Sequence, residues 1–120
     1  LLVECKNEVA LDRSEINKGE TGQMNNACAW FAQKYPGAKA TKLMIIPSKK
    51  LAHGAAFSEE VFVVREKSLK KLGTNLRAFF QEFRTLDFKS LSETKVQELI
   101  DTHELSVDDL LTDYCEPIKS

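Results

Sequence analysis

The sequence predicts an α/β fold: a small mixed sheet with a strand–helix–strand crossover as its core, followed by a C-terminal helical region. Two observations predict it. In residues 1–47, short apolar runs of strand length flank one amphipathic helical stretch. Beyond residue 66, leucine and phenylalanine recur at helical spacing. The chain has 120 residues, the size of a single domain.

Residues 1–7 alternate in the manner of a strand, and residues 8–18 form a polar connection. A helix is predicted over residues 19–35, where Pro36 and Gly37 end it. A second strand follows at residues 41–47. Strands joined by a helix favour parallel pairing. The apolar side of the helix is predicted to comprise Met24, Ala27, Cys28, Phe31 and Tyr35.

The second half begins with a loop at residues 48–58 and a short third strand at residues 60–65. Ser68 is a suitable N-cap for a long helix. Two shorter helices are predicted, one over residues 92–102 and one after the cap residue Ser106, so that the acidic tail is helical. The apolar face of the long helix is predicted to comprise Leu69, Leu72, Leu76, Phe79, Phe80 and Phe83.

Composition limits the possible functions. The net charge is −1, so the chain as a whole does not attract nucleic acid, and any such contact requires a local basic patch. The cysteines are three widely spaced residues, typical of reduced thiols in a cytoplasmic protein. No apolar run is long enough to span a membrane. We therefore expect a cytoplasmic protein with no membrane partner.

The first strand carries two charged residues, Glu4 and Lys6, which point to the same face because they are two residues apart. A charge on an apolar strand requires a partner or a metal ion. In one interpretation the pair simply reaches solvent at a strand end. In the other, Glu4 and the backbone carbonyl of Cys5 ligate a divalent metal ion, while Lys6 stabilises charge that develops on a phosphate.

The spacing E-x-K alone is weak, because Glu93, Thr94 and Lys95 match it as well, at the start of a helix with a polar face. The context distinguishes the first copy. It ends a hydrophobic strand and precedes a loop, a helix and another strand.

V-E-C-K-N at residues 3–7, the E-x-x-Q of Glu20 and Gln23, and K-L-M-I-I-P at residues 42–47 together resemble the second half of the PD-(D/E)xK nuclease core. This is the restriction-endonuclease-like superfamily. The resemblance covers residues 1–47 and implies Mg²⁺- or Mn²⁺-dependent hydrolysis of DNA, with RNA as another possible substrate. It implies Glu4, Lys6 and Gln23 as catalytic residues, and Glu20 beside Glu4 and the Cys5 carbonyl as a metal ligand.

The first acid of the family pattern, which precedes the E-x-K, has no counterpart here, since only three residues precede Glu4. We expect a longer parent protein to supply it. Glu20 acting as a displaced carboxylate is the alternative. The chain is thus predicted to be a fragment of a nuclease domain, with half the nuclease core in residues 1–47 and a mainly helical region in residues 48–120. An exposed strand edge favours a homodimer or a strand-swapped oligomer.

Two lysines after the second strand, Lys49 and Lys50, are candidates for contact with nucleic-acid phosphate, although a solvated loop is the slightly simpler explanation. The rival hypothesis is a non-enzymatic α/β interaction module, or a nucleic-acid-binding module, of a larger protein. The positions of Glu20 and Gln23 distinguish the nuclease from the interaction module, because the nuclease requires both residues within reach of Glu4.

Overall fold

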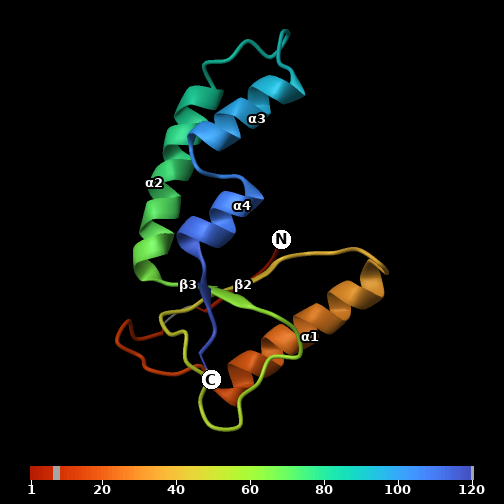
Figure 1. The fold of residues 1–120 in the computed structure, drawn as a ribbon, viewed down its shortest axis with the longest axis vertical. Coiled ribbons are helices and arrows are strands. Elements are labelled where there is room, and N and C mark those ends of the chain that lie inside the picture. Colours follow the sequence, from red (N-terminus) through yellow and green to blue (C-terminus); the bar gives the residue numbers. More distant parts are fainter. Residues whose placement is uncertain (7–8, 120) are drawn as a thin grey trace. The chain divides into compact units, whose positions relative to one another are not determined.

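The structure is a computed structural model that describes residues 1–6 and 9–119 (Figure 1). It has two compact units. Leu1–Glu66 and Cys115–Ser120 form the first, called here the sheet unit, and Lys67–Tyr114 form the second, the helical unit. The α/β class and the small mixed sheet are confirmed.

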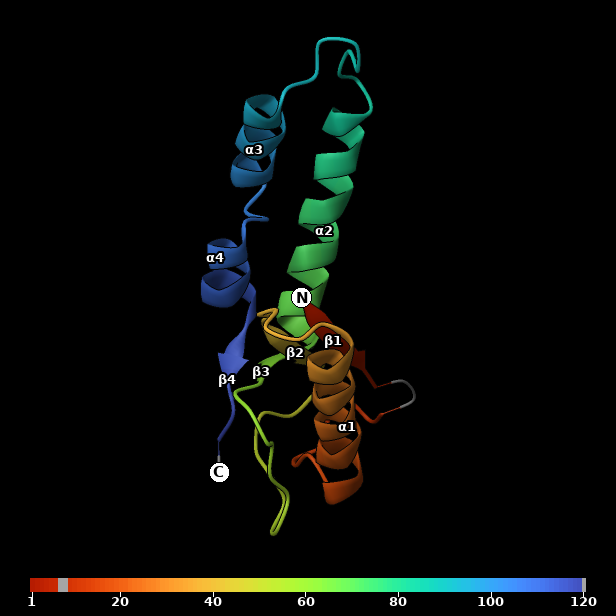
Figure 2. The same cartoon turned by 90° about the vertical axis from the view of Figure 1, so that its right-hand side faces the viewer.

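The sheet has the strand order β1-β2-β3-β4. β1 (Leu2–Cys5), β2 (Lys42–Ile45) and β3 (Phe62–Val64) run parallel, and β4 (Glu116–Pro117) pairs antiparallel with β3. Within the described chain, β1 is therefore an edge strand. Helix α1 (Lys18–Lys34) connects β1 to β2 and packs on one face of the sheet (Figure 2).

Helix α1 begins where a reciprocal cap forms. The side chain of Asn17 accepts a hydrogen bond from the Glu20 amide at 3.0 Å, and the Glu20 carboxylate accepts one from the Asn17 amide at 2.8 Å. Only the first three turns have buried side chains, among them Met24 and Cys28. Tyr35, predicted on the apolar side, is exposed.

The core of the sheet unit lies between α1 and the sheet. Ile16 belongs to the connection predicted as a polar loop, yet its side chain is fully buried. Its backbone bridges to residues 50–52, with Ile16 N to Lys50 O at 2.8 Å and Ala52 N to Ile16 O at 2.9 Å. The buried cluster comprises Ile16, Met24, Cys28, Met44, Ile46, Val61 and Val63.

The helical unit contains most of α2 (Glu66–Phe83), then α3 (Glu93–Thr102) and α4 (Val107–Asp109), which continues as a π-helical turn over Leu110–Tyr114. Ser106 caps α4 as predicted, and Ser92, predicted as the first residue of its helix, caps α3. The predicted start of α2 at Ser68 is wrong. Because α2 follows β3 after a single residue, its first turn begins at Glu66 and includes Ser68.

The aromatic side of α2 is less buried than its periodicity predicts. Phe79 contacts Phe80, Phe83 and His103, whereas the Phe80 side chain is 58% exposed. Tyr114 is the well-buried aromatic residue, and its hydroxyl accepts a hydrogen bond from the Asn75 amide. None of the helices in the described chain combines the length and apolarity needed to cross a bilayer.

The prediction that the tail remains helical is wrong at its end, where Glu116 and Pro117 form β4. Pro117 cannot continue a helix. Glu116 is also held by side chains of the sheet unit, since it accepts hydrogen bonds from Lys49 and Arg65. Backbone pairing with β3 and these charged contacts together favour the extended conformation.

Candidate functional site

Glu4 and Lys6 lie on the face of β1 that packs toward α1. Leu2, on the same face, contacts the buried core. The Glu4 carboxylate and the Lys6 ammonium are 3.6 Å apart, and their side chains are only 31% and 15% exposed. The structure thus brings these two predicted residues together at the carboxyl end of the strand, and they are partly shielded from water rather than fully solvated.

The backbone carbonyl of Cys5 is directed away from β2. The amide of Lys6 donates to the Ile45 carbonyl at 3.1 Å, so it points toward β2. In a planar trans peptide the preceding carbonyl points the opposite way. The Cys5 oxygen therefore faces the outer side of β1, where no strand of the described chain pairs with it. Among the described residues it is a hard oxygen without a strand partner, one residue from the Glu4 carboxylate.

Glu20 enters the same region from α1. It lies one turn before Met24 on the buried side of the helix and is 8% exposed. Burial by itself raises the pKa of Glu20, but hydrogen bonds from Arg13 and from the Asn17 amide, and the charges of Arg13 and Lys6, outweigh it and lower that pKa. The Glu20 carboxylate thus stays ionised and lies within electrostatic range of Lys6.

Both oxygens of Glu20 already have partners. Each accepts a hydrogen bond from the Arg13 guanidinium, and Oε2 also accepts from the Asn17 amide. A metal ion would have to compete with Arg13 for this carboxylate. No sequence pattern pointed to Arg13. The N-x-x-E spacing of Asn17 and Glu20 could have revealed the cap, but no local pattern joins Arg13 to Glu20.

Gln23 lies one turn further along α1 and is exposed. No hydrogen bond in the described structure joins it to Glu4 or Lys6. Of the two discriminating helix residues, Glu20 is buried and its carboxylate is influenced by the charge of Lys6, whereas Gln23 is exposed; no hydrogen bond or ion pair among the described residues joins either of them to Glu4.

The connection after β1 is fixed to the segment that follows β2. The Ser48 hydroxyl donates to the Ser14 carbonyl at 2.6 Å, and the Lys50 ammonium pairs with Glu15 at 3.0 Å. The carboxyl ends of parallel strands meet at one edge of a sheet, where ligands of α/β proteins commonly bind. Arg13 is thereby anchored close to that edge.

The two lysines predicted to contact phosphate are both ion-paired. Lys49 pairs with Glu116 at 2.7 Å, and Lys50 with Glu15. Hydrogen bonds from Arg65, opposed by burial and reinforced by Lys49, lower the pKa of Glu116 to about 2. Lys49 is therefore largely neutralised by a permanent carboxylate, whereas Lys50 has the more exposed side chain, at 59%.

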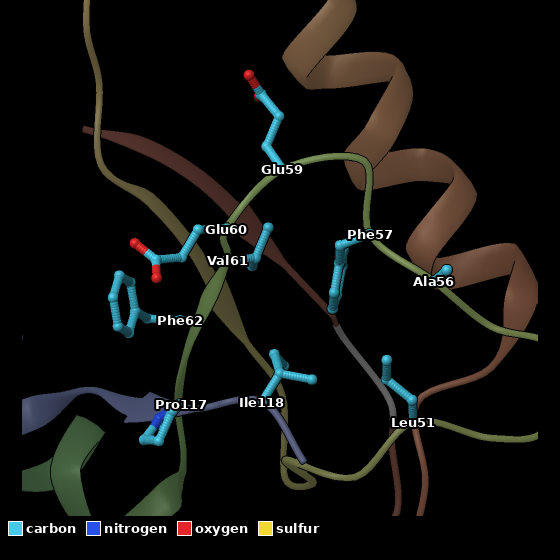
Figure 3. Close-up of a pocket in the computed structure, with 9 residues that line it drawn as sticks. All are labelled: Leu51, Ala56, Phe57, Glu59, Glu60, Val61, Phe62, Pro117 and Ile118. Carbon is cyan, nitrogen blue, oxygen red and sulfur yellow. The ribbon is translucent and has the colours of Figure 1, made fainter. Parts of the chain in front are cut away.

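A separate hollow of about 340 Å³ opens on the sheet unit (Figure 3). Its wall is apolar, and the carboxylates of Glu59 and Glu60 extend from its border. None of the predicted site residues lines it. The apolar lining comprises Leu51, Ala56, Phe57, Val61, Phe62, Pro117 and Ile118.

The described residues include no group of three or more His, Cys, Asp or Glu side chains that could hold a metal ion. Glu4 and the Cys5 carbonyl do match Mg²⁺ and Mn²⁺ in chemical type, because these hard cations prefer oxygen, and Mg²⁺ keeps several waters beside one or two carboxylates. The chain matches no family model, no curated protein and no solved structure in the comparisons made.

Proposed function

We propose that this chain is part of a metal-dependent nuclease domain that hydrolyses DNA phosphodiesters. One observation carries the proposal: Glu4 and Lys6 lie 3.6 Å apart on one face of β1, with the ionised carboxylate of Glu20 in electrostatic range of Lys6. The Glu4–Lys6 pair thus stands at the carboxyl end of β1, and the charge of Lys6 also acts on an acid of α1.

In this proposal Glu4 and the Cys5 carbonyl hold Mg²⁺ or Mn²⁺. When bound, such an ion neutralises phosphate charge and lowers the pKa of a ligated water. Lys6 has the complementary role. Its ammonium lies beside Glu4, where it can donate hydrogen bonds to the attacking water or to a phosphate oxygen that gains charge.

The ligand set is small, since Glu20 is engaged by Arg13. We therefore expect the 120-residue chain to bind metal weakly, and a further acid, as the resemblance implies, to be needed for efficient cleavage. Weak affinity is compatible with the chemistry of Mg²⁺, which dehydrates reluctantly and is often bound through few protein oxygens.

An interaction module is the second candidate function. It is favoured by the internal pairing of the charges, because Glu4 with Lys6 and Glu20 with Arg13 form two neutral pairs. It is also favoured by the exposed position of Gln23. In that case the charges fix the position of α1 on the sheet and carry no chemistry.

A nuclease assay separates the two functions. Plasmid, linear duplex and single-stranded DNA are incubated with Mn²⁺ or Mg²⁺, using both the 120-residue chain and the complete product of the gene that encodes it. The variants are Lys6→Ala and Lys95→Ala, which removes the lysine of the second E-x-K in α3. We expect Lys6→Ala to abolish cleavage and Lys95→Ala to retain it. Absence of cleavage in every combination, or equal loss in both variants, would favour the module.

A further inference from the structure

The Arg13 guanidinium is held by three of its own donors. Its Nη1 and Nη2 groups each donate to Glu20, and its Nε group donates to the Glu15 carbonyl at 3.0 Å. A guanidinium has five N–H donors in a fixed planar arrangement. One N–H on each Nη atom therefore remains for another acceptor, and the orientation of both is set before any ligand arrives.

Arg13 also remains accessible. Its side chain is 25% exposed, although the Glu20 side chain that holds it is only 11% exposed. The neighbouring Ser14 is tied to Ser48 beyond β2, so the backbone that carries Arg13 is fixed as well. A rigid, partly exposed guanidinium with unused donors is suited to binding an anion, because little side-chain entropy is lost on binding.

A second cation lies in the same region. Lys6 directly follows β1, and its charge acts on the Glu20 carboxylate that Arg13 binds from the connection after the strand. Lys6 is itself paired with Glu4. Two cations at different positions in the chain, Lys6 and Arg13, can contact neighbouring groups of an extended polyanion, whereas one cation contacts a single group.

We infer that Arg13 is a phosphate-binding residue of this site, which contacts the DNA backbone while Glu20 holds its guanidinium in place. The inference rests on the proposed function and deepens it. It gives Glu20 a role as the residue that positions Arg13 rather than as a metal ligand, and it adds a substrate contact that the E-x-x-Q pattern does not contain. Guanidinium groups bind phosphate oxygens with well-defined hydrogen-bond geometry.

The test is the salt dependence of DNA binding. Fluorescence anisotropy measures the affinity of the 120-residue chain for labelled duplex and single-stranded oligonucleotides, in Ca²⁺ and over a series of NaCl concentrations. Each phosphate contact contributes about 0.9 to the slope of log affinity against log salt for duplex DNA, and about 0.7 for single strands. Arg13→Gln should reduce the magnitude of this slope by the contribution of about one phosphate contact, and should weaken binding about tenfold at low salt.

Arg65→Gln is the matched control, because Arg65 also donates two hydrogen bonds to a glutamate, Glu116, in the sheet unit. We expect it to keep the wild-type slope. Arg13→Lys should keep the slope but weaken binding about threefold, since an ammonium retains the charge without the planar donor set. If thermal melting shows that Arg13→Gln is unfolded, the DNA affinities of Arg13→Lys and Arg65→Lys are compared instead. Unchanged affinity in Arg13→Lys then overturns the inference.

The outcomes separate this inference from the proposed function. A wild-type slope in folded Arg13→Gln, or an equal loss in Arg65→Gln, overturns the role of Arg13 and leaves the nuclease proposal standing. Arg13-dependent binding without cleavage of any substrate supports the phosphate contact and removes the proposed hydrolysis. Absence of binding by the wild-type chain to either oligonucleotide overturns both.

Discussion

Arg13 and Glu20 are joined by two hydrogen bonds that tie the connection after β1 to the first turn of α1. The same carboxylate closes the cap with Asn17, so one side chain fixes both where the helix begins and how the connection approaches it. The charge of Lys6 also acts on the Glu20 carboxylate. The geometry of the candidate site therefore depends on a contact between the irregular connection and the helix that follows it.

Glu20→Gln is expected to destabilise the chain by about 1–3 kcal/mol, because it leaves the partly buried Arg13 charge without its partner. The glutamine oxygen can still accept from Asn17, so the cap is weakened rather than removed. Urea unfolding monitored by circular dichroism measures the free energy of unfolding.

Glu93→Gln is the control for this substitution. Glu93 is also an acid in the first turn of a helix, α3, but it is exposed. We expect a change within about 0.5 kcal/mol. Equal effects of the two substitutions would mean that Glu20 contributes only through the helix dipole.

Ile16→Ala is expected to cost about 2–4 kcal/mol, the range for removing a large buried aliphatic side chain. Ile16 is fully buried in the core although it lies in a polar connection. Leu11→Ala, in the same connection, serves as its control because Leu11 is 65% exposed. Urea unfolding should show little change for Leu11→Ala, and a similar small change for Ile16→Ala would contradict the packing described.

These contacts show what the sequence could and could not predict. Periodicity identified β1, α1, β2, β3 and the three helices of the second half, because each has a local apolar pattern or a local cap. β4 was missed, since two residues have no periodicity and their extended conformation depends on pairing with β3. The burial of Ile16 was missed for a related reason, because its bridge to residues 50–52 joins distant parts of the chain.

Part of the candidate site, too, could be predicted from the sequence, and part could not. The juxtaposition of Glu4 and Lys6 follows from strand geometry alone, and the structure contains it. The Arg13 contact with Glu20 requires the path of an irregular connection, and neither spacing nor composition specifies that path. The ion pairs of Lys49 and Lys50 depend on Glu116 and Glu15, and Glu116 is 67 residues from Lys49 in the sequence.

Acid should destabilise the chain between about pH 4.5 and pH 2. The pKa of Glu116 falls from its ordinary value of 4.5 to about 2 in the folded chain, through hydrogen bonds from Arg65 and then Lys49. A depressed carboxyl pKa contributes stability that is complete above the unfolded value and is lost as pH falls through the folded one. Glu20, whose pKa is also lowered, acts in the same direction.

Glu116→Gln removes the largest of these contributions. We expect its free energy of unfolding to depend less steeply on pH between 4.5 and 2 than that of the wild type, as measured by urea unfolding at each pH. Glu60→Gln is the control, because Glu60 is exposed and forms no ion pair in the described structure. If both variants retain the wild-type slope, the contacts of Glu116 do not form in solution.

The three cysteines should differ in reactivity with a thiol reagent such as DTNB. Burial, reinforced by Glu59, raises the pKa of Cys28 to about 11, and burial also raises the pKa of Cys115. The thiolate is the reactive form, so both should react slowly in the folded protein at pH 8. Cys5 is exposed and should react first. Cys5→Ser should therefore remove the fast phase of the reaction, whereas Cys28→Ser should leave it intact. A fast phase that persists in Cys5→Ser would show that Cys28 or Cys115 reacts rapidly, which contradicts their burial.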